Sequence, residues 1–392
     1  MGRIAEGVAF HRHPLRFLRS RQSRYGDVFT IRIAVAGPMV VVADPAAIHE
    51  IVENDRGGEA RRHILGMISE RSVLGADGSE HSDARGRLEP PFAHHAVAHL
   101  GEAMAEIADR HAATWPRGRP FRLLPRMRAL LDEVFVRLIL GVRDDRRARE
   151  LAAAIGRMIY TPGNPPIPPP GEGNGLLGAA AKRLFDRRSA PAKRLLAKEL
   201  DARREDTERR HDAIGCMTDL PTAEAVDRLL PLLMAGQEPP AAGLTWLLDR
   251  ISREPGAAER FVDAPDHRYT QAFARETLRV TPPVHSVMRK RDGTLTMVPI
   301  VLIHRDQRAF ENPDLFDPER FLPDPDAAGP DLPFGGGPRR CLGEHLARTE
   351  IASVIPAILR RHQLHPVRPA PERMVVRGTV LVPRHGGLTV SA

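Results

Sequence analysis

The stretch Phe334-Gly335-Gly336-Gly337-Pro338-Arg339-Arg340-Cys341-Leu342-Gly343 decides the fold of this 392-residue chain. It places Cys341 between a glycine-rich loop and a helix expected at about 344–361. A helix N-terminus carries partial positive charge and free N–H groups, and both stabilise a thiolate. The glycines let the backbone approach a large flat group closely. Such a thiolate could be a nucleophile or an axial metal ligand, and haem iron is a centre that accepts a single cysteine.

The composition is that of an ordinary folded protein. Hydrophobic residues make up 42% of the chain and charged residues 28%, and 58 Lys and Arg against 50 Asp and Glu give a net charge of +8. A chain of this length can bury a sizeable core. Its two cysteines exclude a secreted disulfide scaffold and a four-cysteine zinc site. We interpret the second cysteine, Cys216, as an inert structural thiol.

The positive charge does not indicate a nucleic-acid partner. Basic residues are interspersed with acids, as at 203–206, and only 5% of the residues are aromatic, so the stacking residues of strand binders are missing. The N-terminus has no apolar stretch of signal-peptide length, and no run approaches eighteen apolar residues. We therefore expect a cytoplasmic protein that binds neither nucleic acid nor membrane.

The organisation along the chain is mainly helical. A hairpin is expected at 25–43, where two β-rich runs lie on either side of a turn at Gly37-Pro38. Helical pattern covers about 44–210, 222–254, 269–280 and 344–361. A loop dense in proline and glycine, 160–171, interrupts the first of these, and three prolines would by propensity divide the second into two helices. β-like runs return at 374–390, so we expect one domain over residues 1–392, mainly α with a smaller β-rich part.

The cysteine loop resembles, position by position, the haem-binding loop of the cytochrome P450 family. That pattern reads Phe, Gly, any, Gly, any, Arg or His, any, Cys, any, Gly, and it spans Phe334 to Gly343 here. The resemblance implies the cytochrome P450 fold, a haem b cofactor and Cys341 as the proximal thiolate ligand of the iron. It also implies that Arg339 binds a haem propionate.

Two further motifs stand in the order that the resemblance requires. Glu276 and Arg279 match the family's Glu-x-x-Arg, and their spacing of three places both on one helix face. Arg320, in a segment similar to the family's meander, is expected to complete a Glu–Arg–Arg cluster that supports the cysteine loop. We interpret all three residues as structural.

The resemblance also implies further cofactor-binding residues. His81 and Arg85 match a His-x-x-x-Arg, whose donors lie one helical turn apart and in the family reach the haem propionates. Arg289 resembles another propionate-binding arginine.

The expected distal helix departs from the family pattern. It reads Ala235-Gly236-Gln237-Glu238-Pro239-Pro240, so the acid is kept as Glu238, but Pro239 replaces a threonine whose hydroxyl helps to deliver protons. Proline has no donor, and the carbonyls of Ala235 and Gly236 lose the amide that would bond them. Either function is altered at a tolerated kink, or the relay is rebuilt from Glu238 with water or substrate held by the freed carbonyls. We list Glu238 and Pro239 as candidate catalytic positions.

Other segments follow from the resemblance alone. The strand pair after Arg289 looks shortened at 292–299, which leaves the local strands uncertain. Residues expected to face substrate are Ile64–Ser69, the loop after Tyr160, Met234, Glu238, Val284–Val287 and Thr379–Val380.

The implied function is that of a soluble bacterial-type monooxygenase, an oxidoreductase that acts on paired donors and incorporates one oxygen atom. A ferredoxin and a ferredoxin reductase are the expected partners, docking on a basic face of Arg339, Arg340 and Arg348. The expected substrate is a small natural-product intermediate, such as an aromatic or polyketide acid, free or on an acyl carrier protein. Alternatives are a peroxide-using enzyme, an oxidative-coupling or desaturating enzyme, and a catalytically silent partner protein.

Overall fold

We describe a computed structural model of the chain, which covers residues 3–33, 37–65, 68–159, 175–206, 208, 210–262, 267–322 and 332–392. The α-helices are α1 (Arg3–Arg12), α2 (Pro14–Tyr25), α3 (Pro45–Glu53), α4 (Gly57–Leu65), α5 (Gly78–Phe92), α6 (His94–Ala98), α7 (Gly101–Ala112), α8 (Leu123–Val134), α9 (Asp145–Ile159), α10 (Gly175–Glu205), α11 (Thr222–Ala235), α12 (Glu238–Ile251), α13 (Ala257–Val262), α14 (His267–Val280), α15 (Ile300–Ile303) and α16 (Glu344–Arg361). Shorter turns are η1 (Phe135–Ile139), η2 (Gly215–Met217), η3 (Pro318–Phe321) and η4 (Gly337–Arg339).

The strands are β1 (Val28–Ile33), β2 (Gly37–Val42), β3 (Phe121–Arg122), β4 (Val287–Arg291), β5 (Thr294–Val298), β6 (Leu364–Pro366), β7 (Met374–Arg377), β8 (Val380–Pro383) and β9 (Leu388–Ser391). They form a four-stranded sheet in the order β1-β2-β5-β4, a three-stranded sheet β3-β9-β6 and the pair β7-β8. β2 and β5 run parallel, with Val40 opposite Thr296, and the other pairs are antiparallel.

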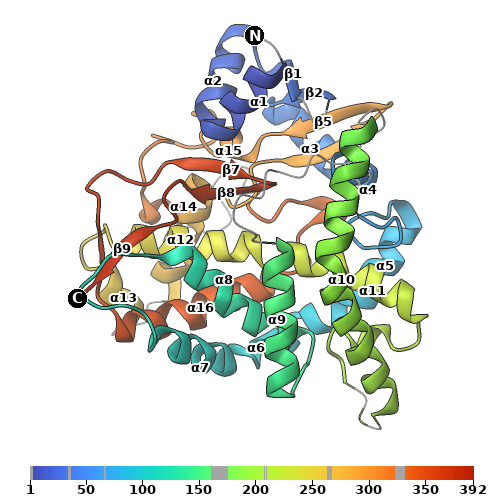
Figure 1. Cartoon of the computed structure of the whole chain (residues 1–392). Helices are drawn as coiled ribbons and strands as arrows, with labels where there is room; N and C mark the ends of the chain where they lie inside the picture. The colour runs from blue at the N-terminus through green and yellow to red at the C-terminus, as the bar shows by residue number, and fades with distance from the viewer. Residues whose placement is uncertain are drawn as a thin grey trace.

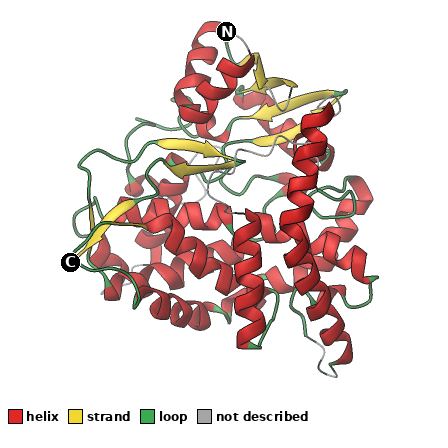
Figure 2. Cartoon of the chain, viewed as in Figure 1, coloured by secondary structure: helices red, strands yellow, loops and turns green. Residues whose placement is uncertain are grey.

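The larger core is helical, and its packing follows from apolar spacing. In α8 the buried residues recur every three or four positions, at Leu123, Met127, Leu130 and Val134. α8 packs against α9 and α12, and α16 packs against α7 and α12. These helices lie together on the side of the molecule away from the N-terminus (Figure 1). The prediction of a mainly α protein with a smaller β-rich part is confirmed: the four-stranded sheet and the β7–β8 pair lie on the other side, and β9 lies beside the helices near the C-terminus (Figure 2).

A second core joins the four-stranded sheet to the first helices. β1 alternates exposed and buried residues, with Phe29, Ile31 and Ile33 facing inward, as a strand with one covered face requires. α1 and α2 cover that sheet and bury Phe10 and Phe17 (Figure 1). The expected hairpin is formed by β1 and β2, but the expected turn residues Gly37 and Pro38 lie in β2, opposite Ile33 and Arg32.

The doubtful strand pair after Arg289 is present. β4 and β5 pair from Val287 opposite Val298 to Arg291 opposite Thr294. Asp292 and Gly293 form the connection, with φ values of 47° and 75°. Two successive positive φ angles are what a tight two-residue hairpin requires, and Asp-Gly suits them.

Candidate functional site

The cysteine loop is held close to α3. Gly335 and Gly337 have φ values of 71° and 60°, which favour glycine. A Cβ at Gly337 would come within 2.9 Å of the carbonyl oxygen of Val52, so glycine also permits the close approach. The backbone N–H of Cys341 donates to the carbonyl of Phe334 over 2.8 Å, which closes the loop around the thiol. Gly343 then occupies the N-cap position of α16.

The Cys341 side chain is exposed to solvent, yet protein surrounds it closely. Burial raises the pKa of its thiol. The backbone N–H of Gly343 and the charges of Arg85 and Arg61 oppose that rise and favour a thiolate.

Arg339 lies beside this thiol with its donors occupied by the protein. It is 7% exposed. Its Nε donates to the carbonyl of Asp55 over 2.6 Å, and Nη2 reaches both the carbonyl of Ala76 and the carboxylate of Asp77. The expected propionate contact of Arg339 therefore stays a prediction, and its observed role is to tie the cysteine loop to the segment before α5.

Arg289 carries an unused donor. It is 1% exposed, and its Nη1 and Nη2 donate to the carbonyls of Met288 and Val52 at 3.0 and 2.9 Å. Its Nε is buried without a hydrogen-bond partner among the described residues. Burial, followed by the charges of Arg61 and Arg339, lowers the pKa of Arg289 to about 10. A buried cation with an orphaned N–H is costly unless an anion completes it.

His81 and Arg85 reach the same region from α5. His81 is 3% exposed, and burial with the charges of Arg339 and Arg85 lowers its pKa to about 4, so it is neutral at pH 7. Arg85 donates to the carbonyl of Arg340 over 2.8 Å, directly before Cys341. Arg85 thus contacts the cysteine loop, and the expected propionate contacts of His81 and Arg85 stay predictions.

The donor set fits a haem. An accessible thiol at a helix N-terminus suits an iron ligand, and an orphaned arginine N–H beside further desolvated cations suits carboxylates such as the two propionates of the macrocycle. Arg61 belongs to this cationic group, and sequence reasoning missed it.

The distal segment is broken between α11 and α12. α11 ends at Ala235 and α12 begins at Glu238, so the proline-rich sequence does divide the expected helix. Ala235 is exposed although Leu233 and Gln237 are buried. A Cβ at Gly236 would lie 2.3 Å from the ring of Phe135 in η1, a π-helical turn of the kind often found at functional sites.

Glu238 is paired, and sequence reasoning did not find its partner. The Nε of Arg128 in α8 donates to Glu238 over 2.8 Å, and a second contact joins the same two groups. Gln237 is fully buried, and neither atom of its side-chain amide has a partner among the described residues. No local signal points to Arg128, because it lies on another helix far away in the chain.

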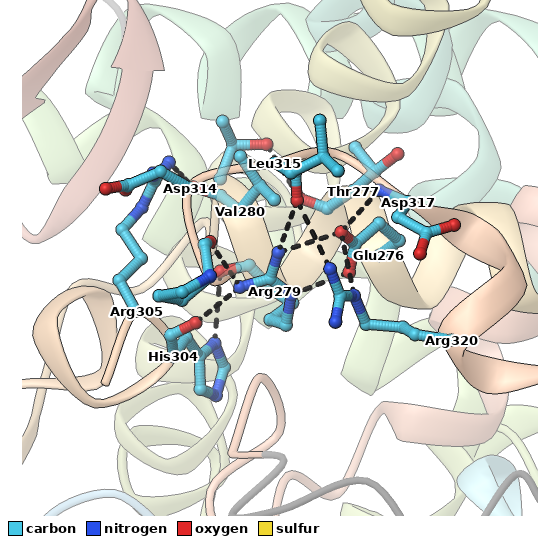
Figure 3. A network of polar contacts seen from close by, with 12 residues as sticks. Glu276, Thr277, Arg279, Val280, His304, Arg305, Asp314, Leu315, Asp317 and Arg320 are labelled. Carbon is cyan, nitrogen blue, oxygen red and sulfur yellow. Dashed lines mark hydrogen bonds and ion pairs between the residues drawn. The ribbon is translucent and has the colours of Figure 1, made fainter. Parts of the chain in front are cut away.

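The Glu–Arg–Arg cluster forms as expected (Figure 3). Glu276 is fully buried and accepts from Arg279 at 2.6 and 2.8 Å and from Arg320 at 3.3 Å. Arg279 also donates to the carbonyls of His304, Pro313 and Leu315. His304 in turn accepts from the backbone N–H of Leu332, two residues before Phe334. The cluster thus holds the entry to the cysteine loop.

The expected substrate-facing segments are only partly placed. Val284 and Val380 form an isolated β-bridge, which brings two of these segments together. Met234 packs against the larger core. The loop after Tyr160 and two residues of Ile64–Ser69 lie outside the described residues.

Comparison with known proteins decides the family. The cytochrome P450 family model matches residues 4–390. The chain belongs to the cytochrome P450 family. It is 32% identical to cytochrome P450 135B1 of Mycobacterium tuberculosis over 416 residues, covering 97% of this chain and 88% of the relative. It is 31% identical to cytochrome P450 135A1 of the same organism, covering 98% and 92%.

Solved P450 structures share the fold. Retinoic acid-bound cyanobacterial CYP120A1 superposes with a TM-score of 0.80 at 21% identity, covering 99% of this chain and 96% of that one. A mutant of P450 EryK in complex with erythromycin B gives a TM-score of 0.74 at 20% identity, covering 97% and 96%. Membership of this family makes the protein a haem-binding oxidoreductase of the monooxygenase type. Within the described residues, the helices are too short or too polar to span a bilayer.

Proposed function

We propose that this P450 hydroxylates a small organic molecule, using dioxygen and electrons from a ferredoxin. The observation that supports this most is the accessible thiol of Cys341 at the N-terminus of α16, beside the orphaned donor of Arg289. Haem b, when bound, supplies the reductive activation of dioxygen. The residues of this chain hold the cofactor, place the substrate and provide protons. We further propose that the protein acts in the cytoplasm and that residues 1–392 form a single domain.

Cys341 is the residue that would bind the haem iron. The N–H groups at the start of α16 and the positive charge of Arg85 stabilise its thiolate, and the hydrogen bond to Phe334 fixes its place. Arg289, with its unused Nε, is the proposed anchor of a haem propionate, and His81, Arg85 and Arg339 line the same region.

Proton supply is proposed to run through water or substrate beside the α11–α12 break. Pro239 and Pro240, in the first turn of α12, have no N–H to donate to the carbonyls of Ala235 and Gly236, and the amide of Gln237 is buried with unused hydrogen-bonding capacity. Buried polar groups of this kind retain ordered water. The Arg128 ion pair holds the carboxylate of Glu238 in a fixed position next to them.

Two variants test this route. Gln237→Leu removes the unused amide, and we expect less product per reducing equivalent with little change in substrate affinity. Pro239→Thr restores a side-chain donor, and we expect coupling to change. If coupling of reductant to product is unchanged in both variants, the segment has no part in proton delivery.

The proposed electron donor is an acidic ferredoxin. Arg340 and Arg348 present side chains that are 55% and 52% exposed beside the cysteine loop, and both pair with Glu344. Arg339 does not belong to this face, because it is 7% exposed and holds the loop from inside. This corrects the expected three-arginine patch. Since rim charges act mainly on association, Arg348→Glu is expected to slow reduction at low salt and to make the rate less salt-dependent.

The proposed substrate is an aromatic or polyketide acid from natural-product biosynthesis. One P450 structure contains retinoic acid and another erythromycin B, so this fold accepts organic molecules of very different shape. Titration of the ferric protein with such acids, free and bound to an acyl carrier protein, should shift the Soret band toward its high-spin position. A shift with carrier-bound acids alone would identify the carrier protein as a partner.

One experiment separates this proposal from its alternatives. Turnover with labelled dioxygen, ferredoxin and ferredoxin reductase should leave one labelled oxygen atom in the product. Turnover with hydrogen peroxide alone at the same rate would favour a peroxide-using enzyme. A product without label would favour oxidative coupling or desaturation.

A further inference from the structure

Arg61 occupies an unusual place on α4. The helix begins with Gly57 and Gly58, and residue 61 lies one turn further along the face that they share. A Cβ at Gly57 would come within 3.0 Å of Nη1 of Arg289, and one at Gly58 within 2.3 Å of the carbonyl oxygen of Ala76. The two glycines therefore let α4 approach both β4 and the segment before α5.

The direction of a helical side chain places Arg61 over this gap. Long side chains on a helix point back toward its N-terminus and cover the preceding turn. The preceding turn of α4 is the one that touches Arg289 on one side and the Gly75–Ala76 segment on the other. The N-terminus of α4 is fixed there by Asp77, whose two carboxylate oxygens accept from the backbone N–H groups of Gly58 and Glu59.

The carboxylates near Arg61 are already used. Asp77 also accepts from Arg339, and Asp55 accepts through a side-chain oxygen from the backbone N–H of Gly78. Within the described parts of the chain, Arg61 itself makes no hydrogen bond and no ion pair. Its neighbour Arg62 lies 3.8 Å from both Glu70 and Asp77. The Arg62 side chain is 27% exposed, and it thus shares Asp77 with Arg339.

The surroundings of Arg61 make an unpaired charge costly. Burial and the charge of Arg339 lower the pKa of the Arg61 guanidinium to about 10, and the negative charges of Asp77 and Cys341 oppose this. The side chain is only half-buried, so a ligand can reach it. At neutral pH the group is still a cation, and a desolvated cation requires an anionic partner.

We propose that Arg61 binds a propionate of the haem, as a further residue of the cofactor site beside Arg289. This inference rests on the proposed haem-thiolate function. A cofactor carboxylate fits better than a substrate carboxylate because the neighbours of Arg61 are Arg289, Arg339 and Asp77, which all belong to the support of the cysteine loop. The glycine pair at 57–58 then serves to bring α4 within reach of the cofactor.

The test compares Arg61→Gln with Arg146→Gln in the haem-loaded protein, because the Arg146 side chain is 76% exposed on α9. Loss of one charge-assisted hydrogen bond corresponds to about tenfold or more in an equilibrium. We therefore expect haem transfer to apomyoglobin to accelerate about tenfold or more in Arg61→Gln, and to stay within about twofold of the parent in Arg146→Gln. Arg61→Lys, which keeps the charge but not the fork, should lie between them.

The unfolding midpoint is a second readout, and Arg61→Gln should change it in opposite directions in the haem-free and the haem-loaded protein. Without haem, Arg61 is a desolvated cation with no partner, so Arg61→Gln should raise the unfolding midpoint of the haem-free chain and lower that of the loaded one. A haem-transfer rate equal to that of the parent would overturn the inference, and weaker binding of free acids in that case would assign Arg61 to substrate. If the parent itself takes up no haem, the proposed function fails instead.

Discussion

Replacing Glu276 by glutamine tests whether the buried cluster in Figure 3 stabilises the protein through its negative charge. Glu276 is fully buried and is the carboxylate that both Arg279 and Arg320 contact, and the backbone N–H of Asp317 donates to it as well. Glutamine has nearly the same shape but brings an N–H₂ group against two guanidinium groups. Arg279 is also fully buried, so its charge would remain in the interior without a counterion.

The expected cost is large. Removing one partner of a buried ion pair destabilises a protein by about 3–5 kcal/mol, because the remaining charge is uncompensated. Urea unfolding of Glu276→Gln at pH 7 should show a loss of this size. The matched control is Asp186→Asn, which breaks the ion pair with Lys182. The side chains of Lys182 and Asp186 are 59% and 47% exposed. It should cost less than about 1 kcal/mol. If Glu276→Gln loses no more stability than the control, the reasoning about this cluster is wrong.

Further expected outcomes concern glycines and buried titratable groups. Gly58→Ala should destabilise the protein by at least about 2 kcal/mol, because its Cβ would clash with backbone carbonyls. Gly86→Ala has open space around its Cβ in α5 and should stabilise the protein by up to about 1 kcal/mol. The unfolding midpoints of the two variants and the parent test both expectations. Burial lowers the pKa of His304 to about 3, so below pH 6.5 the unfolded state gains a proton that the folded state does not. Stability should therefore fall between pH 6.5 and 5 by about 2 kcal/mol more than in His304→Gln, and an equal fall in both would contradict this. Burial raises the pKa of Glu350 to about 8, so stability should fall by about 2 kcal/mol as pH rises from 6 to 8, and Glu350→Gln should lose this dependence in the same unfolding assay.

The sequence was most informative where function depends on neighbouring residues. The cysteine loop and the helix that follows it are specified by local pattern: glycines at positive φ, one cysteine and a helix start. α16 runs from Glu344 to Arg361, as expected. The Glu276–Arg279 pair could be predicted equally well, because residues three positions apart lie next to each other on one face of a helix.

Partners from distant segments could not be found in this way. Arg128 meets Glu238, and Arg61 reaches the cysteine loop, only because α8 and α4 pack beside elements far away in the sequence. The burial of Arg339 was missed for the same reason, since the loop reads as surface until α3 and α5 enclose it. The uncertainty about the β4–β5 hairpin had a different cause. Asp292-Gly293 is a strong local turn signal, and the family pattern was given more weight than that signal.

The spectrum of the reduced protein with carbon monoxide tests the central claim most directly. The account predicts a Soret band at the long wavelength that thiolate ligation gives, in the parent and in the control Cys216→Ser. Cys216 is a suitable control because burial raises the pKa of its thiol and because its backbone carbonyl, not its thiol, accepts the hydrogen bond from Arg87. In Cys341→His the band should move to the shorter wavelength of imidazole ligation. A long-wavelength band that survives in Cys341→His, or that disappears in Cys216→Ser, would contradict the assignment of Cys341 as the haem ligand.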